Sequence, residues 1–172
     1  MRVSRLAFTA MAAVACLVLA AAAAALLRHP AAAAPTLVGE RAPEISLATA
    51  DGRRLSLSDF AGHPVVLNFW ASWCSSCRSE VDLLNASARA GSGGAQFLGV
   101  DIQDSAGAAA AFEAAHAHAY PVGPGSAGGY LRFGVSAPPE TFFVDPGGVV
   151  VAHVVGPLSQ GSLAGGLARA AR

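Results

Sequence analysis

Residues 65–78 read Val-Val-Leu-Asn-Phe-Trp-Ala-Ser-Trp-Cys-Ser-Ser-Cys-Arg, so a mostly apolar segment runs directly into a Cys-x-x-Cys motif. The run 65–69 predicts a strand buried on both faces at the centre of a sheet. A helix is expected to follow over residues 74–89. At the start of a helix, free backbone N–H groups and the helix dipole stabilise a thiolate. The motif therefore predicts a reversible two-electron centre in which Cys74 and Cys77 form a disulfide and only Cys74 faces solvent.

A zinc site is the alternative interpretation of a Cys-x-x-Cys motif. Such a site needs two further ligands at matching spacing, and the sequence contains no second pair of cysteines. The remaining cysteine, Cys16, lies in an apolar N-terminal stretch. We therefore expect redox chemistry that uses no metal and no other cofactor.

Length and composition narrow the class of protein. The chain of 172 residues has room for one ordinary domain and an appendage. Its formal net charge is zero, and no basic stripe with interleaved aromatic residues is visible, so nucleic acid is not an expected partner. A single pair of cysteines cannot form the several disulfides of a disulfide-stabilised domain, so an apolar core must stabilise this one. We expect a monomer.

Residues 1–28 predict a targeting segment. Two arginines precede an uncharged stretch, residues 6–27, which at about 1.5 Å per residue is long enough to cross a bilayer of about 30 Å. The positive flank favours a cytoplasmic N-terminus with the domain outside. We favour an uncleaved signal anchor with Cys16 in the membrane, and a cleaved signal peptide is the alternative. A Pro/Ala-rich linker, residues 29–38, leads to one domain, residues 39–172.

Apolar periodicity and turn residues outline the rest of the domain. The expected elements are a hairpin around Asp51-Gly52, a helical turn at 58–62, a strand at 96–101, a helix at 107–118, a loop at 123–129, a short helix near 130–133, strands at 141–144 and 149–155, and a helix at about 159–171. Their order describes an α/β fold, in which helices flank a mixed sheet and a β-hairpin extends the N-terminus.

Three stretches carry a resemblance to a known family. Gly39–Pro43 matches a G-x-x-A-P pattern, residues 57–74 match the approach to a redox motif, and residues 133–145 contain G-V-x-x-x-P-E-T-F. Together they resemble the thioredoxin-like superfamily, and within it the membrane-anchored thiol:disulfide oxidoreductases of the CcmG/DsbE and ResA/TlpA type. The resemblance implies a thioredoxin-like fold for the redoxin domain. One departure is Ser75-Ser76 between the cysteines, where the family often has a proline.

Five residues receive roles at the centre. Cys74 is the predicted nucleophile, because attack on a disulfide requires a thiolate at the helix start. Cys77 is the predicted resolving thiol, and Trp73 is expected to cover the dithiol and meet a partner. The resemblance implies that Pro139 is a cis-proline opposite the dithiol, with its peptide available to pair with a client. It also implies that Glu140 belongs to an acidic patch that shapes partner choice, and a plain surface glutamate is the alternative.

Glu80 lies one helical turn after Cys77 and is a candidate for exchanging a proton with that thiol. An acid near a buried thiol raises its pKa through like-charge repulsion. The resemblance places Asn68 where ordinary thioredoxins carry a buried acid, so Glu80 could assume that role; a solvated helix residue is the alternative. The domain's histidines are expected at the surface and outside catalysis: His63, His116, His118 and His153.

The resemblance implies a reductase for exported clients such as apocytochrome c, supplied with electrons by a membrane protein of the CcdA/DsbD type. An oxidase that forms disulfides in exported proteins stays open, since hydrogen bonds from Ser75 or Ser76 to sulfur would make the centre more oxidising. A copper-handling module with His153 as a ligand is a third interpretation. A peroxidase is not expected, because the Pro-x-x-x-Thr-x-x-Cys pattern of peroxiredoxins is absent.

Overall fold

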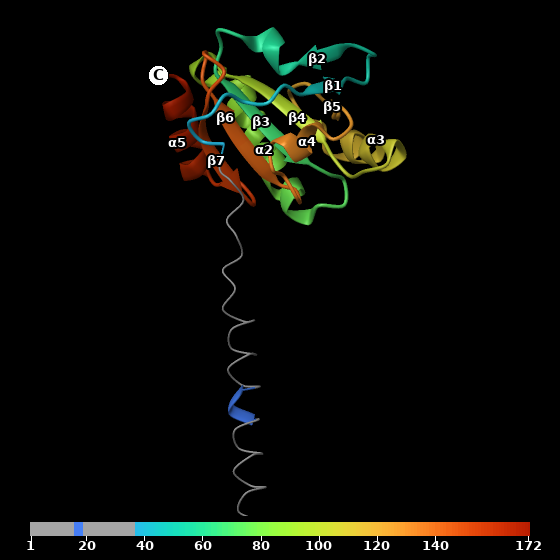
Figure 1. The fold of residues 1–172 in the computed structure, drawn as a ribbon. Helices are drawn as coiled ribbons and strands as arrows, with labels where there is room; N and C mark the ends of the chain where they lie inside the picture. Colours follow the sequence, from blue (N-terminus) through green and yellow to red (C-terminus); the bar gives the residue numbers. More distant parts are fainter. Residues whose placement is uncertain (1–15, 19–36) are drawn as a thin grey trace, which may run out of the picture. The chain divides into compact units, whose positions relative to one another are not determined.

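The computed structural model describes residues 16–18 and 37–172 (Figure 1). The chain divides into two units, residues 1–34 and 35–172. Of the first unit, only residues 16–18 are described, and they are helical. Apart from residues 16–18, the predicted leader lies outside the described residues, as does most of the predicted linker. In the described part of the chain, no helix is both long enough and apolar enough to cross a bilayer.

A five-stranded mixed sheet forms the centre of the domain, in the order β5-β4-β3-β6-β7. Its central strand is β3, Val65–Trp70, and all six residues are buried. β3 pairs in parallel with β4, Gln96–Asp101, and antiparallel with β6, Glu140–Val144. The edge strands are β5, Val122–Pro124, and β7, Val150–Val155. The position predicted for residues 65–69 is confirmed.

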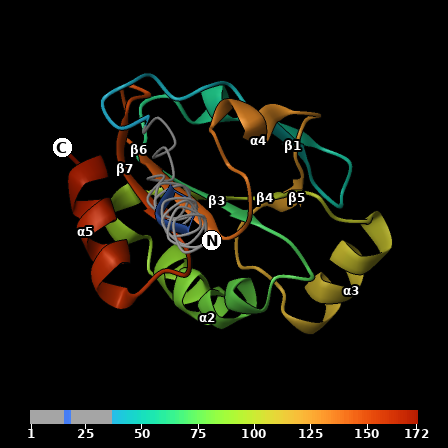
Figure 2. The same ribbon diagram turned by 60° about the horizontal axis from the view of Figure 1, so that its bottom comes forward.

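Helices α2, Ser75–Arg89, and α5, Gln160–Ala170, cover one face of this sheet. Figure 2 shows both on the same side of the strands, with α3, Ala106–Ala115, beyond the end of α2. A short 3-10 turn, η2 at Ser92–Gly94, connects α2 to β4. The apolar side chains that fill this layer include Val66, Leu84, Phe97, Phe143, Ala152 and Leu163.

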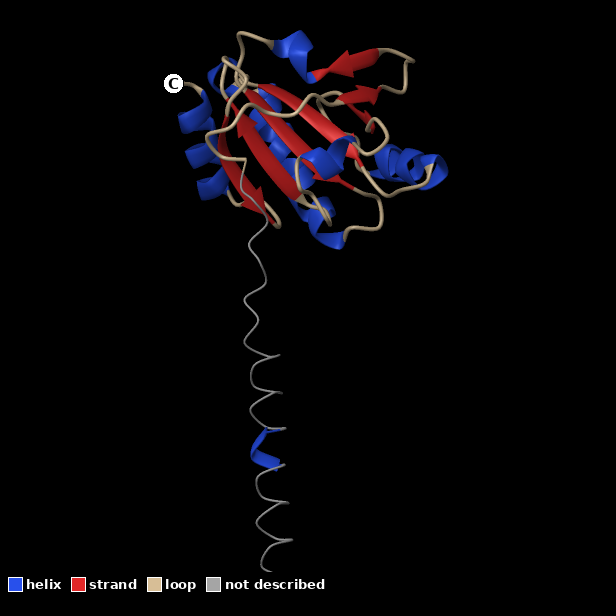
Figure 3. Cartoon of the chain, in the orientation of Figure 1, coloured by secondary structure: helices blue, strands red, loops and turns tan. Residues whose placement is uncertain are grey.

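The opposite face is covered by the N-terminal hairpin and by α4, Gly129–Arg132. In the hairpin, β1, Ser46–Ala48, pairs antiparallel with β2, Arg54–Ser56, as predicted. The 3-10 helix η1, Leu57–Phe60, follows at the predicted helical turn. Figure 3 shows these two short strands beside the larger sheet. The thioredoxin-like arrangement of a mixed sheet between flanking layers is therefore present, with the hairpin as an addition.

The stretch 123–129, predicted as a loop, begins inside a strand. Residues 122–124 form β5 and pair in parallel with β4. A Cβ on Gly123 would lie 1.9 Å from the carbonyl oxygen of Ala48. Glycine is therefore required here by the close approach of the hairpin to the sheet edge, whereas its presence in the sequence suggested a flexible loop.

Candidate active site around the dithiol

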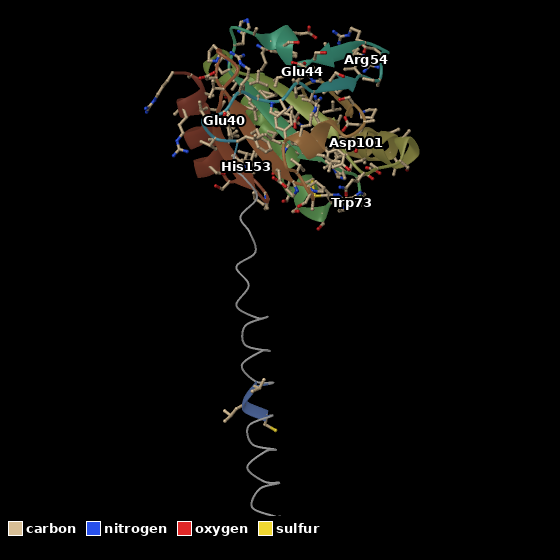
Figure 4. All side chains as sticks on the ribbon, viewed as in Figure 1. Glu40, Glu44, Arg54, Trp73, Asp101 and His153 are labelled. Carbon is tan, nitrogen blue, oxygen red and sulfur yellow. A yellow bond between two sulfur atoms is a disulfide. The ribbon has the colours of Figure 1, made fainter. Side chains whose placement is uncertain are left out.

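The two motif cysteines form a disulfide at the start of α2. Their sulfurs are 2.05 Å apart and their Cα atoms 5.3 Å apart. Cys74 is the N-cap residue of the helix, and the backbone N–H of Cys77 donates to its Sγ at 3.0 Å. Figure 4 shows the disulfide at the edge of the domain next to Trp73. A helix N–H directed at Cys74 is the interaction that would stabilise its thiolate in the reduced protein.

The expectation that Cys74 faces solvent is wrong for the disulfide form. Cys74 is 4% exposed and Cys77 2% exposed. Both pack in one cluster with Trp70 of β3 and Phe112 of α3. These apolar neighbours cover the sulfurs, whereas the adjacent Trp73 is 56% exposed. Trp70, 2% exposed, is a core residue.

The loop between β4 and α3 supports the backbone of the redox motif. Asp104 accepts a hydrogen bond from the N–H of Ser72 through Oδ2 at 2.6 Å. The indole Nε1 of Trp73 donates to the backbone carbonyl of Gln103 at 3.0 Å. The loop therefore holds the two residues that immediately precede Cys74.

The peptide bond between Pro138 and Pro139 is cis, so the cis-proline is Pro139, as predicted. Strand register places it near the dithiol, because Phe69 of β3 pairs with Glu140 at the end of β3 that leads to the motif. The carbonyl of Pro139 accepts from Gly156 N at 2.9 Å. Its pairing with a client stays a prediction.

Glu80 is buried within the domain, so its interpretation as a solvated helix residue is wrong. The side chain is 2% exposed. Its Oε1 accepts from Asn68 Nδ2 at 2.8 Å, and its Oε2 accepts from the backbone N–H of Leu158 at 2.8 Å. Asn68 also donates to Thr141 Oγ1 at 3.0 Å. A carboxyl group with both oxygens bound by neutral donors therefore lies one helical turn beyond Cys77.

Burial raises the pKa of Glu80 above its ordinary value of 4.5. The hydrogen bonds from Leu158 and Asn68, and the charge of His118, lower the pKa and oppose this effect. The carboxyl group therefore binds a proton more readily than an exposed glutamate does. Such a group is suited to accept a proton from a neighbouring thiol.

Glu140 does not contribute to an acidic surface patch. It is 5% exposed, and its Oε2 lies 2.8 Å from His153 Nε2. The ring of His153 stacks on Phe142 at a centroid distance of 4.0 Å. Pairing across β6 and β7 thus turns the carboxylate toward the histidine and away from solvent.

The expectation of surface histidines is also wrong at His118. Its side chain is 2% exposed and pairs with Glu113. Its ring contacts Trp70 and Tyr120, at centroid distances of 5.0 and 5.1 Å. A spacing of two residues from His116 indicated nothing of this, because the ring is buried against Trp70 of β3, which is distant in sequence, as well as against nearby Tyr120.

Asp101 is a residue near the site that sequence reasoning missed. It pairs with Trp70 in the β3–β4 register, is 7% exposed, and its Oδ1 is buried without a hydrogen-bond partner. Burial, with added repulsion from Asp104 and Glu113, raises the pKa of Asp101 to about 7. The sequence did contain a signal for Asp101, because this residue ends the predicted strand 96–101. Parallel strands end at the same edge of a sheet, so that position lies at the edge where the strand 65–69 leads into the redox motif.

No group of three or more His, Cys, Asp or Glu side chains arranged to hold a metal ion occurs within residues 16–18 and 37–172. His153, the candidate ligand for copper, is bound to Glu140 instead.

A dithiol at a helix start, on this sheet and beside a cis-proline, defines a thiol:disulfide oxidoreductase. The chain belongs to the AhpC/TSA family, whose model matches residues 38–153. It is 36% identical over 135 residues to the thiol:disulfide interchange protein DsbE homolog of Paracoccus denitrificans, covering 75% of this chain and 72% of that protein. It is 32% identical over 124 residues to the thiol-disulfide oxidoreductase ResA of Bacillus subtilis, covering 71% and 69%.

A solved structure agrees with these relatives. The crystal structure of a thiol:disulfide interchange protein DsbE from Chlorobium tepidum matches with a TM-score of 0.66 and 29% identity, covering 74% of this chain and 95% of that one. The protein is thus a thiol:disulfide oxidoreductase of the DsbE/ResA type, with the Cys74–Cys77 pair as its redox disulfide.

Proposed function

We propose that this protein is an extracytoplasmic disulfide reductase, anchored through residues 1–28, that reduces exported clients such as apocytochrome c. The observation that carries the direction of the reaction is the burial of Glu80, 2% exposed, one turn from Cys77. Strong disulfide oxidants have a stabilised reduced form. A buried carboxyl group beside the thiols disfavours their ionisation. The reduced form is then less stabilised and gives up its electrons more readily.

The reaction begins with the reduced dithiol. The Cys74 thiolate attacks one sulfur of the client disulfide, which forms a mixed disulfide and releases the first client sulfur as a thiolate that takes up a proton. Cys77 gives its proton to the Glu80 carboxylate, and its sulfur attacks Cys74 Sγ. The Cys74–Cys77 disulfide forms, the second client sulfur leaves and takes up a proton from solvent, and Glu80 releases the proton that it received. Two electrons pass to the client, and the two protons that it takes up balance the one lost when Cys74 ionised and the one lost from Cys77 through Glu80.

A fresh cycle requires reduction of the Cys74–Cys77 disulfide. A membrane protein of the CcdA/DsbD type would deliver the two electrons by thiol–disulfide exchange, and two protons would be taken up.

The leader sequence supports an extracytoplasmic location, since two arginines before an apolar stretch favour export of the domain on its C-terminal side. Pro139 and Trp73, which flank the dithiol, are the groups proposed to contact the client.

The deciding experiment is an equilibrium titration of the full chain against glutathione. A reductase of this fold should have a reduction potential of about −250 mV, whereas a value of about −130 mV would contradict the proposed direction. Reduction of a disulfide-containing apocytochrome c peptide, followed by alkylation and mass measurement, would then test the client.

One observation favours the opposite direction, oxidation of exported clients. Ser76 Oγ lies 3.5 Å from Cys74 Sγ. A hydroxyl that donates to this sulfur would stabilise the thiolate and make the centre more oxidising. If this contact dominates, Ser76→Ala should make the potential clearly more negative, while Ser79→Ala, which alters a serine further along α2, should not.

A further inference from the structure

Gln103 has an unusual backbone conformation beside the redox motif. Its φ is +54°, and it is the sole non-glycine residue with positive φ among the described residues. L-residues other than glycine, asparagine and aspartate rarely adopt this region. Where they do, the surrounding structure must hold them, and such positions often lie at functional sites. The contacts of Gln103 indicate what holds it.

Gln103 connects the two surfaces that flank the dithiol. Its backbone carbonyl accepts from Trp73 Nε1 at 3.0 Å, and its side-chain Nε2 donates to the carbonyl of Ser136 at 3.2 Å. Trp73, labelled in Figure 4, is 56% exposed beside the disulfide. Ser136 is exposed and lies two residues before the cis peptide bond. One residue therefore ties the motif loop to the loop that ends in the cis-proline.

We propose that Gln103 is a positioning residue that fixes the exposed Trp73 indole relative to the 136–139 loop, and so sets the spacing of the surface that receives an extended polypeptide client. This inference rests on the proposed function, because it assumes that a polypeptide disulfide reaches the dithiol. The polar contacts of Gln103 go to Trp73 and Ser136, and none goes to either cysteine. Its role is therefore in client binding and not in the exchange of electrons.

Two substitutions separate the side-chain bridge from the backbone conformation. Gln103→Asn keeps a residue that tolerates positive φ, but its side chain is one carbon shorter and loses reach to Ser136. Gln103→Glu keeps the length and replaces the donating amide with an oxygen, which cannot donate to the Ser136 carbonyl. Gln160→Glu, at an exposed residue on α5, is the matched control for the added charge.

The experiment measures steady-state reduction of insulin and of cystamine, a small disulfide, by the full chain. In both Gln103 variants the KM for insulin should rise by about 2- to 10-fold, the range that loss of one hydrogen bond supports, while kcat stays within about twofold. Cystamine reduction and the reduction potential should match the unsubstituted chain and Gln160→Glu. A shift in KM without a shift in potential is not expected from general loss of structure.

Two outcomes would overturn the inference alone. In the first, both variants keep the KM of the unsubstituted chain for insulin. In the second, insulin and cystamine reduction fall together and the potential changes, which would mean that Gln103 acts on the dithiol itself. If the unsubstituted chain reduces neither disulfide, the proposed function fails and this inference fails with it.

Discussion

Asn68 on β3 donates a hydrogen bond of 2.8 Å to Glu80 on α2, and both side chains are 2% exposed. The pair joins the central strand to the helix that carries the dithiol. The partner of the carboxyl group in this contact is a neutral amide. Glu80 therefore meets no buried charge from Asn68, whether the carboxyl group is ionised or protonated. The pair explains how a carboxyl group is retained in the core one turn from Cys77.

Glu80→Gln should lower the pKa of the reduced dithiol, because it removes the acid that repels a thiolate. The pH profile for alkylation of the reduced chain should move to lower pH, by on the order of half a unit to one unit. Asp82→Asn, which changes an exposed carboxylate on the same helix, is the control and should leave the profile in place. Superimposable profiles for Glu80→Gln and the unsubstituted chain would exclude proton exchange with the thiol.

Substitution of Cys74 and substitution of Cys77 should produce two different defects in the reaction. Cys74→Ser should abolish insulin reduction, because it removes the sulfur that attacks. Cys77→Ser should accumulate a mixed disulfide between Cys74 and the client, since the resolving sulfur is absent. Non-reducing electrophoresis and intact mass would detect the adduct. Full turnover by Cys77→Ala would show that the assigned resolving role is wrong.

The buried Asp101 predicts a pH dependence of folding stability. Its pKa is raised from 3.8 to about 7 in the folded protein, so between these values the folded state binds a proton that the unfolded state has lost. Its contribution to stability is therefore greatest at acidic pH and decreases as the pH rises toward 7, by up to about 1.4 kcal/mol per pH unit. Asp101→Asn should reduce this slope in urea unfolding at pH 5, 6 and 7. An unchanged slope would mean that the carboxyl group titrates normally.

Two adjacent glycines in α5 should respond oppositely to alanine. A Cβ on Gly166 would lie 2.4 Å from the ring of Phe143, so Gly166→Ala should destabilise the domain by about 1–3 kcal/mol. A Cβ on Gly165 meets nothing within 4 Å, so Gly165→Ala should stabilise it by about 0.5–1 kcal/mol through helix propensity. Urea unfolding of the two variants checks both signs, and equal shifts would contradict the packing of α5 on β6.

Local sequence signals predicted most elements because each signal belongs to a single segment. The buried run became β3, the cysteine pair became the start of α2, and the Asp51-Gly52 turn became a hairpin. The local signals gave a wrong prediction at β5, where glycine and proline indicated a loop. A three-residue edge strand depends on its partner, β4, and on the hairpin that approaches Gly123.

The sequence by itself determined the redox chemistry and the mixed sheet around residues 65–69, since each depends on residue type at a fixed spacing, while the choice of Pro139 over Pro138 as the cis-proline came from the resemblance to a known family. The tertiary structure alone decided that Glu80 is buried, that Glu140 faces His153, and that Gln103 connects Trp73 to the loop before Pro139. Burial and long-range hydrogen bonds depend on which distant segments pack together. That information is spread over the whole chain and is absent from any single motif.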